Sequence, residues 1–252
     1  MLLLSSISTL SMEKVKRKFN PAADDHNWSV LFATHMANLQ QLGAVHPMWQ
    51  EGYDRLCIDP AKRPREEKLS AVLRGLTGFE LVQTGASVIM EQIDWYTCLA
   101  AGQLPCTCFV RTPEELNYCD EPDYWHDVMG HAAFLAIGSY AEMYRLLAVT
   151  YVRAFRENRT DILPTLDFIG GLFIELGLIR EPSGLKAFGA TFYSSGEVAE
   201  AFRPEHQVMF TDEALRSGET YDRHKFQGKY YVFRSMEQVT ELIRDVALRL
   251  DR

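Results

Sequence analysis

The hydrophobic positions of the chain recur mainly at helical spacing. Between Asp25 and Gly43 apolar residues return every three or four positions, so we predict a helix there with Asp25 as its N-cap. The segment DPAKRPREEKLSAVLRGLTG predicts a prolyl turn and then a helix that ends at Gly78. Three later segments favour helices more strongly: SYAEMYRLLAVTYVRAFRENR, LDFIGGLFIELGLI and SMEQVTELIRDVALRLDR. The last of these opens with Ser235 and Gln238 at the spacing of a capping box.

Strand signals are few. The segment GFELVQTGASV is too rich in glycine and β-branched residues to continue a helix, so we expect a strand or turn there. The segment QLPCTCFVRT, in which Cys106, Cys108 and Val110 alternate with polar or aromatic residues, is the best strand candidate. Because strands do not alternate regularly with helices, the pattern argues against a parallel βαβ sheet. We predict a mainly helical α+β fold with small β elements.

Length and hydrophobic content indicate one domain. A chain of 252 residues, 47% of them hydrophobic, can bury one substantial core. We predict that residues 1–24 form a flexible N-terminal extension and that residues 25–252 form a single catalytic domain. The opening MLLLSSISTL has neither the basic region nor the cleavage site of a signal peptide, and Met12 is an alternative start. No window reaches the roughly 18 apolar residues of a membrane span.

Charge and cysteine content narrow the class of protein. The formal net charge is −8, which argues against a nucleic-acid or anionic-membrane partner. The five cysteines are an odd number, scattered along the chain, and they lack the paired spacing of a zinc site. We interpret them as buried free thiols in a reducing compartment and predict a cytoplasmic protein that binds neither nucleic acid nor membrane.

Two histidines, His126 and His131, lie five residues apart in the stretch EPDYWHDVMGHAAFL. We expect Asp120 to cap a helix that begins at Glu121. On an α-helix the two rings would point about 140° apart, unlike the i, i+4 pair of H-E-x-x-H. A bend at Gly130 would bring both rings to one ion. The alternative is a pair of histidines buried in the core without a metal.

A third candidate ligand, Glu175, lies in an almost wholly apolar segment. An unpaired buried carboxylate is costly, so this side chain needs a cation, a strong hydrogen-bond donor or a metal. Two histidines and one carboxylate form the facial triad of non-haem iron enzymes. The alternatives are a Glu–Arg pair inside the core and a zinc hydrolase that uses Asp127 as its base.

Four stretches resemble the tetrahydropterin-dependent aromatic amino acid hydroxylases in their short bacterial, phenylalanine-hydroxylase-like form: LTGFELV, FVRTPEELNYCDEPDYWHDVMGH, IELGLI and FGATFYSSGE. The similarity spans Glu66 to Val246. It implies the single-domain catalytic fold of that family, with Fe(II) bound by His126, His131 and Glu175. It further implies that iron and a tetrahydropterin, tetrahydrobiopterin or a relative, activate O2 together. The substrate would be phenylalanine, tryptophan or a related aromatic amino acid, hydroxylated on its ring.

Other roles follow from positions that match the family. Arg111 matches an arginine that clamps the substrate carboxylate, a task suited to its bidentate fork. Asp123 matches the acid that orients this arginine, and Ser194 matches a serine on the same carboxylate. Trp95 stands where the family has a ring that stacks on the pterin, and Asp127 where an acid faces the pterin site.

Several pocket positions depart from the family pattern. Gly170 and Gly171 stand where two aromatic residues usually line the pterin and substrate pockets. Leu176 replaces a phenylalanine, and Cys119 replaces a polar residue beside the substrate clamp. We therefore predict a reshaped pocket; the alternative is that the two glycines only permit close helix packing. The vacated space would be taken by a larger substrate or by one of three neighbours, namely Phe168, Phe173 or Tyr193.

The end of the chain and its retained motifs shape two further expectations. The chain stops just after the helix predicted at 236–251, so we expect a monomer or at most a weak dimer.

A non-catalytic binding protein on the same fold is a further alternative. The joint presence of His126, His131, Glu175 and Arg111 argues against it, because such a protein has no need of a costly buried carboxylate.

Overall fold

The computed structural model describes residues 21–84, 90–119, 121–222 and 225–251. The α-helices in these ranges are α1 (Pro21–Gln41), α2 (Pro47–Leu56), α3 (Glu66–Thr77), α4 (Gln92–Ala100), α5 (Ala133–Leu135), α6 (Gly138–Arg156), α7 (Leu163–Ile169), α8 (Glu197–Ala201) and α9 (Met236–Leu250). The strands are β1 (Glu80–Gln83), β2 (Gln103–Cys106), β3 (Leu178–Glu181), β4 (Gly184–Ala187), β5 (Gln207–Met209) and β6 (Tyr230–Phe233). Two π-helical segments are η2 (His126–Ala132) and η3 (Gly170–Glu175), and four 3-10 turns are η1 (Pro113–Glu115), η4 (Ala190–Tyr193), η5 (Pro204–His206) and η6 (Ala214–Arg216).

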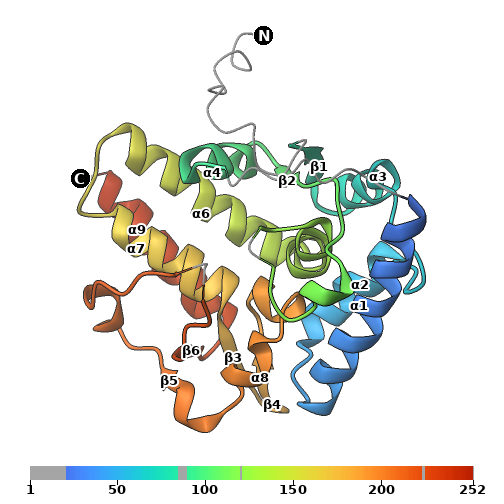
Figure 1. Cartoon of the computed structure of the whole chain (residues 1–252). Coiled ribbons are helices and arrows are strands. Elements are labelled where there is room, and N and C mark those ends of the chain that lie inside the picture. The colour runs from blue at the N-terminus through green and yellow to red at the C-terminus, as the bar shows by residue number, and fades with distance from the viewer. Residues whose placement is uncertain (1–20, 85–89, 120, 223–224, 252) are drawn as a thin grey trace, which may run out of the picture.

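Helix α6 runs through the middle of the molecule (Figure 1). It packs against α4 on one side and against α7 and α9 on the other, while α1 and α2 lie at the far end. The small sheet that contains β3 and β6 lies below α7 in the same view. The prediction of a mainly helical fold with small β elements is confirmed.

Helix ends were the most predictable local features. Gly78 ends α3 with a φ of 76°, and its N–H donates to the carbonyl of Arg74. The hydroxyl of Ser235 accepts a hydrogen bond from the backbone N–H of Gln238 at 3.3 Å and caps α9. The side chain of Gln238 reaches back to the N–H of Arg234, one residue earlier than a standard capping box requires. Both predicted ends are confirmed.

The predicted start of the first helix was wrong. Helix α1 begins at Pro21, so Asp25 lies inside the helix and is not its N-cap. The Asp25 carboxylate instead accepts a hydrogen bond from the backbone N–H of Arg63 at 3.0 Å, a partner that local sequence does not reveal. Residues 21–24, which we assigned to the extension, form the first turn of α1, and residues 1–20 lie outside the described residues.

The prediction that the chain forms no parallel βαβ sheet was also wrong. Strands β1 and β2 pair in parallel with α4 between them in the chain. The second sheet has the order β4-β3-β6-β5, in which β3 and β4 are antiparallel and the other two pairs are parallel. Strand β2 ends at Cys106, so the predicted strand is shorter than its alternating pattern suggested, and Cys108 and Val110 follow it.

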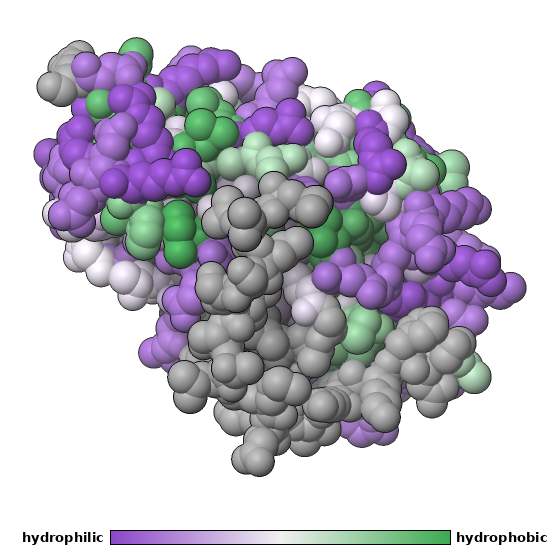
Figure 2. Space-filling model, turned by 90° about the horizontal axis from the view of Figure 1, so that it is seen from above, coloured by the Kyte–Doolittle hydropathy of each residue, from purple (hydrophilic) through white to green (hydrophobic). Residues whose placement is uncertain are grey.

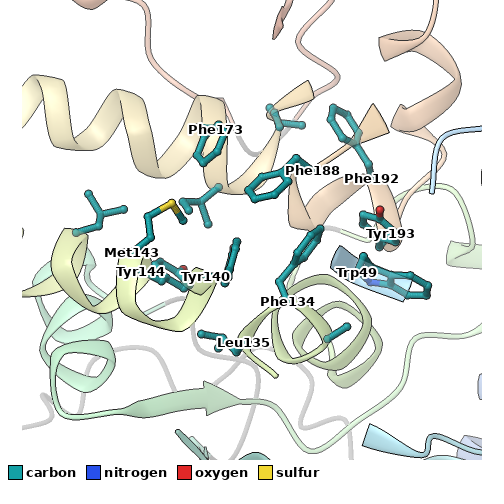
Figure 3. Close-up of a cluster of buried hydrophobic side chains, with 14 of the residues drawn as sticks. Trp49, Phe134, Leu135, Tyr140, Met143, Tyr144, Phe173, Phe188, Phe192 and Tyr193 are labelled. Atoms are coloured by element: carbon teal, nitrogen blue, oxygen red, sulfur yellow. The ribbon is translucent and has the colours of Figure 1, made fainter. Parts of the chain in front are cut away.

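A cluster of buried aromatic side chains includes residues from η3, from η4 and from α5, which follows η2 (Figure 3). Phe134 of α5 and Phe173 of η3 each pack on Phe188, with ring centroids 4.9 Å apart in both contacts. Trp49 of α2 stacks on Tyr193 at 4.5 Å. These contacts fix η2, η3 and η4 relative to one another, because each segment contributes to or adjoins the same layer of rings.

The surface in Figure 2 is mainly hydrophilic, with smaller hydrophobic patches between the polar side chains. Among the described residues no single helix is long and apolar enough to cross a bilayer. A pair of segments, His126–Leu135 and Gly138–Arg156, passes that test only when joined, and the two are bent by 107°. All five cysteines are free thiols, as the scattered pattern indicated.

Candidate active site

The segment that carries both histidines begins at Tyr124, not at Glu121 as predicted. The predicted cap, Asp120, lies outside the described residues. Asp123 performs the capping instead: its Oδ1 accepts a hydrogen bond from the backbone N–H of His126 at 3.1 Å. A carboxylate three residues before the bonded N–H is the ordinary geometry of an N-cap.

The two histidines approach each other because η2 is π-helical rather than bent. A π-helix closes with i→i+5 hydrogen bonds, so residues five apart fall on the same side of the segment. The rings of His126 and His131 accordingly lie edge to face, with centroids 4.8 Å apart. The expected bend at Gly130 is therefore unnecessary. Gly130 is needed for a different reason, since a Cβ there would lie 2.8 Å from the carbonyl oxygen of Ala190.

The third ligand comes from the second π-helical segment. Glu175 is the last residue of η3, and its Oε1 lies 3.2 Å from Nε2 of His131. Its Oε2 lies 3.7 Å from Nε2 of His126 and accepts a hydrogen bond from the hydroxyl of Thr191 at 3.1 Å. The structure thus brings the three predicted metal ligands together from segments far apart in the chain.

The donor set fits a divalent metal ion. Ligand atoms of His126, His131 and Glu175 all lie within 4.8 Å of one another. Two donors at about 2.1 Å from one ion are at most about 4.2 Å apart, so a small inward shift of the side chains would let all three reach the same ion. The hydroxyl of Ser194 lies 2.8 Å from Nδ1 of His126 and donates to the carbonyl of Thr191. It therefore accepts from an Nδ1–H, which leaves Nε2 of His126 unprotonated and free to bind a metal.

The charge states of His126 and Glu175 suit the same use. Burial lowers the pKa of the His126 imidazole to about 4, so the ring is neutral near pH 7. Burial alone would raise the pKa of the Glu175 carboxyl, but His131, His126 and the Thr191 hydroxyl together bring that pKa down to about 2. A neutral imidazole and an ionised carboxylate are the forms that bind metals. We refer to His126, His131 and Glu175 as the metal centre.

Arg111 and Asp123 form a buried ion pair beside the metal centre. Nη2 of Arg111 lies 2.6 Å from Oδ1 of Asp123, and the backbone N–H of Arg111 donates to Oδ2 at 2.8 Å. Nη1 donates to the carbonyl oxygen of Ser194 at 2.8 Å. Nε is buried and has no hydrogen-bond partner among the described residues. Asp123 therefore holds one side of the planar Arg111 guanidinium, and Nε is left as an unused donor. This arrangement fits the binding of a ligand carboxylate.

Trp95 and Asp127, the two residues predicted to face the pterin, line the same cavity. Trp95 is half-buried in α4, its ring centroid is 5.8 Å from that of His131, and its indole N–H donates to the hydroxyl of Tyr144 at 3.4 Å. Asp127 accepts two hydrogen bonds from Thr107, one from the backbone N–H at 2.8 Å and one from the hydroxyl at 3.1 Å. Burial raises the pKa of Asp127 to about 7.

Two tyrosines occupy the space beside the unusual glycines. A Cβ on Gly170 would lie 2.1 Å from the hydroxyl oxygen of Tyr96, which comes from α4. A Cβ on Gly171 would lie 2.4 Å from Cβ of Tyr221, which comes from the segment before β6. We call these four residues the glycine wall. At both positions the glycine makes room for a side chain from a distant segment.

The side chains expected to fill this space are elsewhere. Phe173 packs on Phe188 and Phe233. Phe168 packs on Phe210 and Tyr231. Tyr193 packs on Trp49 and Phe134, so all three rings belong to the core. Leu176 does not line the cavity either. It is 1% exposed and belongs to the hydrophobic core, so the predicted substrate contact does not fit this geometry.

One cavity of 430 Å³ contains the metal centre, the Arg111 clamp and the glycine wall. Cys119 lines it, half-buried, and burial raises the pKa of its thiol. The predicted residues that line the cavity are Trp95, Arg111, Cys119, His126, Asp127, His131, Gly170, Gly171, Glu175 and Ser194. Asp123 stays behind Arg111, completely buried, which agrees with an orienting role.

Several residues of the site were not predicted from the sequence. Thr191 lies within the quoted stretch FGATFYSSGE, so its position was available although its bond to Glu175 was not. Thr107, Tyr96 and Tyr221 gave no signal, because each acts through contact with a residue far away in the chain.

A buried carboxylate, Glu197, is linked through Gln227 to the residue that follows Tyr221. Glu197 is 4% exposed and accepts hydrogen bonds from the backbone N–H of Gln227 and from the hydroxyl of Tyr230, at 2.9 and 2.8 Å. Gln227 in turn donates to the carbonyl oxygen of Asp222 at 2.6 Å. These bonds connect Asp222, next to Tyr221, to the buried Glu197, and they support the position of Tyr221 against Gly171.

Comparisons with known proteins agree with this geometry. The chain is 25% identical over 236 residues to phenylalanine-4-hydroxylase of Pseudomonas aeruginosa, which covers 91% of this chain and 85% of that protein. It is 26% identical over 190 residues to tyrosine 3-monooxygenase of Rattus norvegicus, of which it spans only 37%. The crystal structure of phenylalanine hydroxylase from Chromobacterium violaceum bound to cobalt superposes with a TM-score of 0.79 at 26% identity, covering 91% of this chain and 83% of that one.

A family model extends the match to nearly the whole described chain. It covers residues 22–252 and describes the biopterin-dependent aromatic amino acid hydroxylases. Members of that family are pterin-dependent monooxygenases that use Fe(II) and a tetrahydropterin. The His/His/Glu cluster found here supplies the donor set that such a cofactor requires. The chain therefore belongs to the biopterin-dependent aromatic amino acid hydroxylase family.

Proposed function

We propose that this enzyme hydroxylates the ring of an aromatic amino acid, phenylalanine, tryptophan or a close derivative, with Fe(II) held by the metal centre. The observation that carries the proposal is the presence of His126, His131 and Glu175 in one cavity with the buried Arg111 fork. Bound iron and tetrahydropterin would together supply the activation of O2. The protein's own part is to position the substrate and to shield the site from water.

The proposed roles of the side chains follow from their partners. Asp123 holds the guanidinium of Arg111 in place, and the free donors of Arg111 would bind the substrate carboxylate. Trp95 offers a ring face in the same cavity for the flat pterin. Ser194 fixes the tautomer of His126 through its hydroxyl and braces Arg111 through its carbonyl oxygen, and so links the two halves of the site.

A zinc hydrolase is less well supported. Its general base would have to be Asp127, whose Oδ2 already accepts two hydrogen bonds from Thr107. The planar aromatic surface of Trp95 and the Arg111 clamp have no evident use in such a reaction. A cytoplasmic location and a monomeric or weakly dimeric state remain predictions.

The test is anaerobic reconstitution with Fe(II), followed by O2 uptake in the presence of a tetrahydropterin and a series of aromatic amino acids. We expect O2 uptake coupled to a hydroxylated product, identified by mass spectrometry and NMR. Reconstitution with Zn(II) serves as the control and should give a bound metal without O2 uptake. Failure to bind Fe(II), or O2 uptake that no aromatic amino acid stimulates, would contradict the proposal.

A further inference from the structure

A polar cluster lies in the cavity wall next to Trp95, and neither the metal centre nor the Arg111 clamp uses it. Gln92 and Tyr96 lie on α4 on either side of Trp95, and Asp167 lies on the neighbouring helix α7. All three line the cavity. We call these three residues the polar cluster. Its composition differs from the apolar and aromatic lining expected for a pocket that only stacks flat rings.

The members of the cluster are fixed by one another. Nε2 of Gln92 donates to Oδ1 of Asp167 at 2.7 Å, and the hydroxyl of Tyr151 also interacts with this carboxyl group. The ring of Tyr96 stacks on that of Tyr151 with centroids 4.2 Å apart, which leaves Tyr96 only 3% exposed. Gly170 is required for this arrangement, because a Cβ there would meet the Tyr96 hydroxyl oxygen at 2.1 Å.

Asp167 retains unused acceptor capacity. A carboxylate can accept about four hydrogen bonds, and Gln92 and Tyr151 occupy only part of that number. Within the described ranges no lysine or arginine lies within ion-pair distance of Asp167. Burial raises the pKa of this carboxyl group. A partly buried acceptor that lines a cavity is stabilised when a ligand supplies donors to it.

We propose that the polar cluster is a subsite that hydrogen-bonds hydroxyl groups of a bound ligand, with the Asp167 carboxylate as the principal acceptor. The inference rests on the proposed function, which offers two ligands with suitable groups. One is a reduced pterin with a hydroxylated side chain, and the other is an aromatic substrate with a ring hydroxyl. The position of the cluster on both sides of Trp95 favours the pterin side chain.

The experiment compares ligands that differ only in hydroxyl groups. Fe(II)-loaded protein is titrated anaerobically by calorimetry with tetrahydrobiopterin, whose side chain is hydroxylated, and with 6-methyltetrahydropterin, whose side chain is not. Asp167→Asn keeps the shape of the side chain and removes its charge. We expect it to weaken tetrahydrobiopterin binding roughly ten- to a hundredfold and to change 6-methyltetrahydropterin binding by less than about twofold. Tyr96→Phe should give a smaller loss in the same direction.

A matched control and a second ligand pair complete the design. Asp94→Asn lies on the same helix at an exposed position outside the cavity lining, and it should leave both affinities unchanged. Titrations with phenylalanine and tyrosine ask whether the substrate supplies the hydroxyl group. A loss confined to tyrosine would support the subsite and assign it to the substrate.

Two results bear on the proposals separately. Equal losses for hydroxylated and unhydroxylated ligands, or no loss at all in Asp167→Asn and Tyr96→Phe, would overturn the subsite. Circular dichroism of both variants shows whether such losses reflect unfolding. Absence of pterin binding by the unmodified protein would instead contradict the proposed function, before any variant is considered.

Discussion

The metal centre and the glycine wall share one cavity but are built in different ways. Two ligands of the metal centre are held by hydroxyl groups within or near the family motifs, His126 by Ser194 and Glu175 by Thr191. Nδ1 of the buried His131 has no hydrogen-bond partner among the described residues. The glycine wall is shaped instead by close steric contacts at its two glycines. Its shape results from the absence of two side chains on η3 and from two tyrosines that arrive from α4 and from the segment before β6.

This difference follows from what each part of the cavity has to do. The chemistry at the metal centre needs its donor atoms in one arrangement, and the π-helical turns provide it. The wall only needs to exclude water and fit its ligands, so rings can be exchanged between distant segments. In this chain the hydroxyl oxygen of Tyr96 lies beside Gly170, and Cβ of Tyr221 lies beside Gly171.

The largest expected effect concerns the metal centre. His131→Ala removes one of three donors from a buried cluster, so we expect loss of stoichiometric Fe(II) binding and of all activity. Metal analysis after anaerobic gel filtration measures the bound iron. His26→Ala is the matched control, because His26 is exposed on α1 and should leave iron binding unchanged. Retention of iron in His131→Ala would remove this residue from the metal centre.

The next effect concerns the Arg111 clamp. Arg111→Lys keeps the charge but loses the planar fork, so we expect kcat/KM for the amino acid to fall by roughly a hundredfold, with iron binding intact. Steady-state kinetics with metal analysis tests this. Arg55→Lys is the control, since Arg55 forms an exposed ion pair with Glu51. A variant with unchanged KM and kcat would show that the clamp does not bind substrate.

The metal centre was predictable from sequence for a physical reason. Ligands such as His126 and His131 must be particular residue types at fixed spacing, so chemistry leaves a readable pattern. What the pattern did not show was how residues five apart meet, because no residue type encodes a π-helical turn. The ends of α3 and α9 were equally readable, since Gly78 and Ser235 satisfy local backbone requirements.

The features that sequence did not predict all depend on distant contacts. The parallel pairing of β1 and β2 joins strands separated by a helix, and Asp25 finds its partner in Arg63 rather than at a helix end. Likewise, the sequence around Gly171 did not predict that Tyr221 lies against this glycine. The sequence suggested a larger substrate, or side chains such as Phe168, Phe173 or Tyr193, for this space, and these three side chains point into the core instead.

The third prediction tests the glycine wall directly. Gly171→Ala places a Cβ against Cβ of Tyr221, which a change of rotamer cannot relieve, so we expect a loss of about 1–3 kcal/mol in the free energy of unfolding. Tyr221→Gly should restore part of that loss, whereas Tyr221→Ala should not, because alanine keeps the clashing atom. Urea denaturation of the single and double variants measures both effects.

A matched glycine makes that comparison sharper. Gly75 lies inside α3, and an added Cβ there meets nothing within 4 Å. Gly75→Ala should therefore stabilise the protein by about 0.5–1 kcal/mol through helix propensity alone. Similar changes in Gly75→Ala and Gly171→Ala would show that the close contact with Tyr221 is absent in solution.

The smallest predicted effect concerns how the buried His35 makes the free energy of unfolding depend on pH. His35 is buried and stacks on Trp125, and burial with the nearby positive charge of Arg111 lowers its pKa to about 4, against the opposing charge of Asp123. The unfolded chain takes up this proton near the ordinary pKa of 6.5, before the folded protein does. Stability should therefore fall by about 1 kcal/mol per pH unit between about pH 6 and pH 5 on account of this group.

His35→Gln isolates that contribution. Glutamine does not titrate, so the unfolding free energy of the variant should depend less steeply on pH in this interval, even if its absolute stability is lower. Urea titrations of both proteins at a series of pH values give the two slopes. Equal slopes would mean that the His35 ring is already accessible to protons in the folded state, and that the packing behind the metal centre is looser than the contact with Trp125 requires.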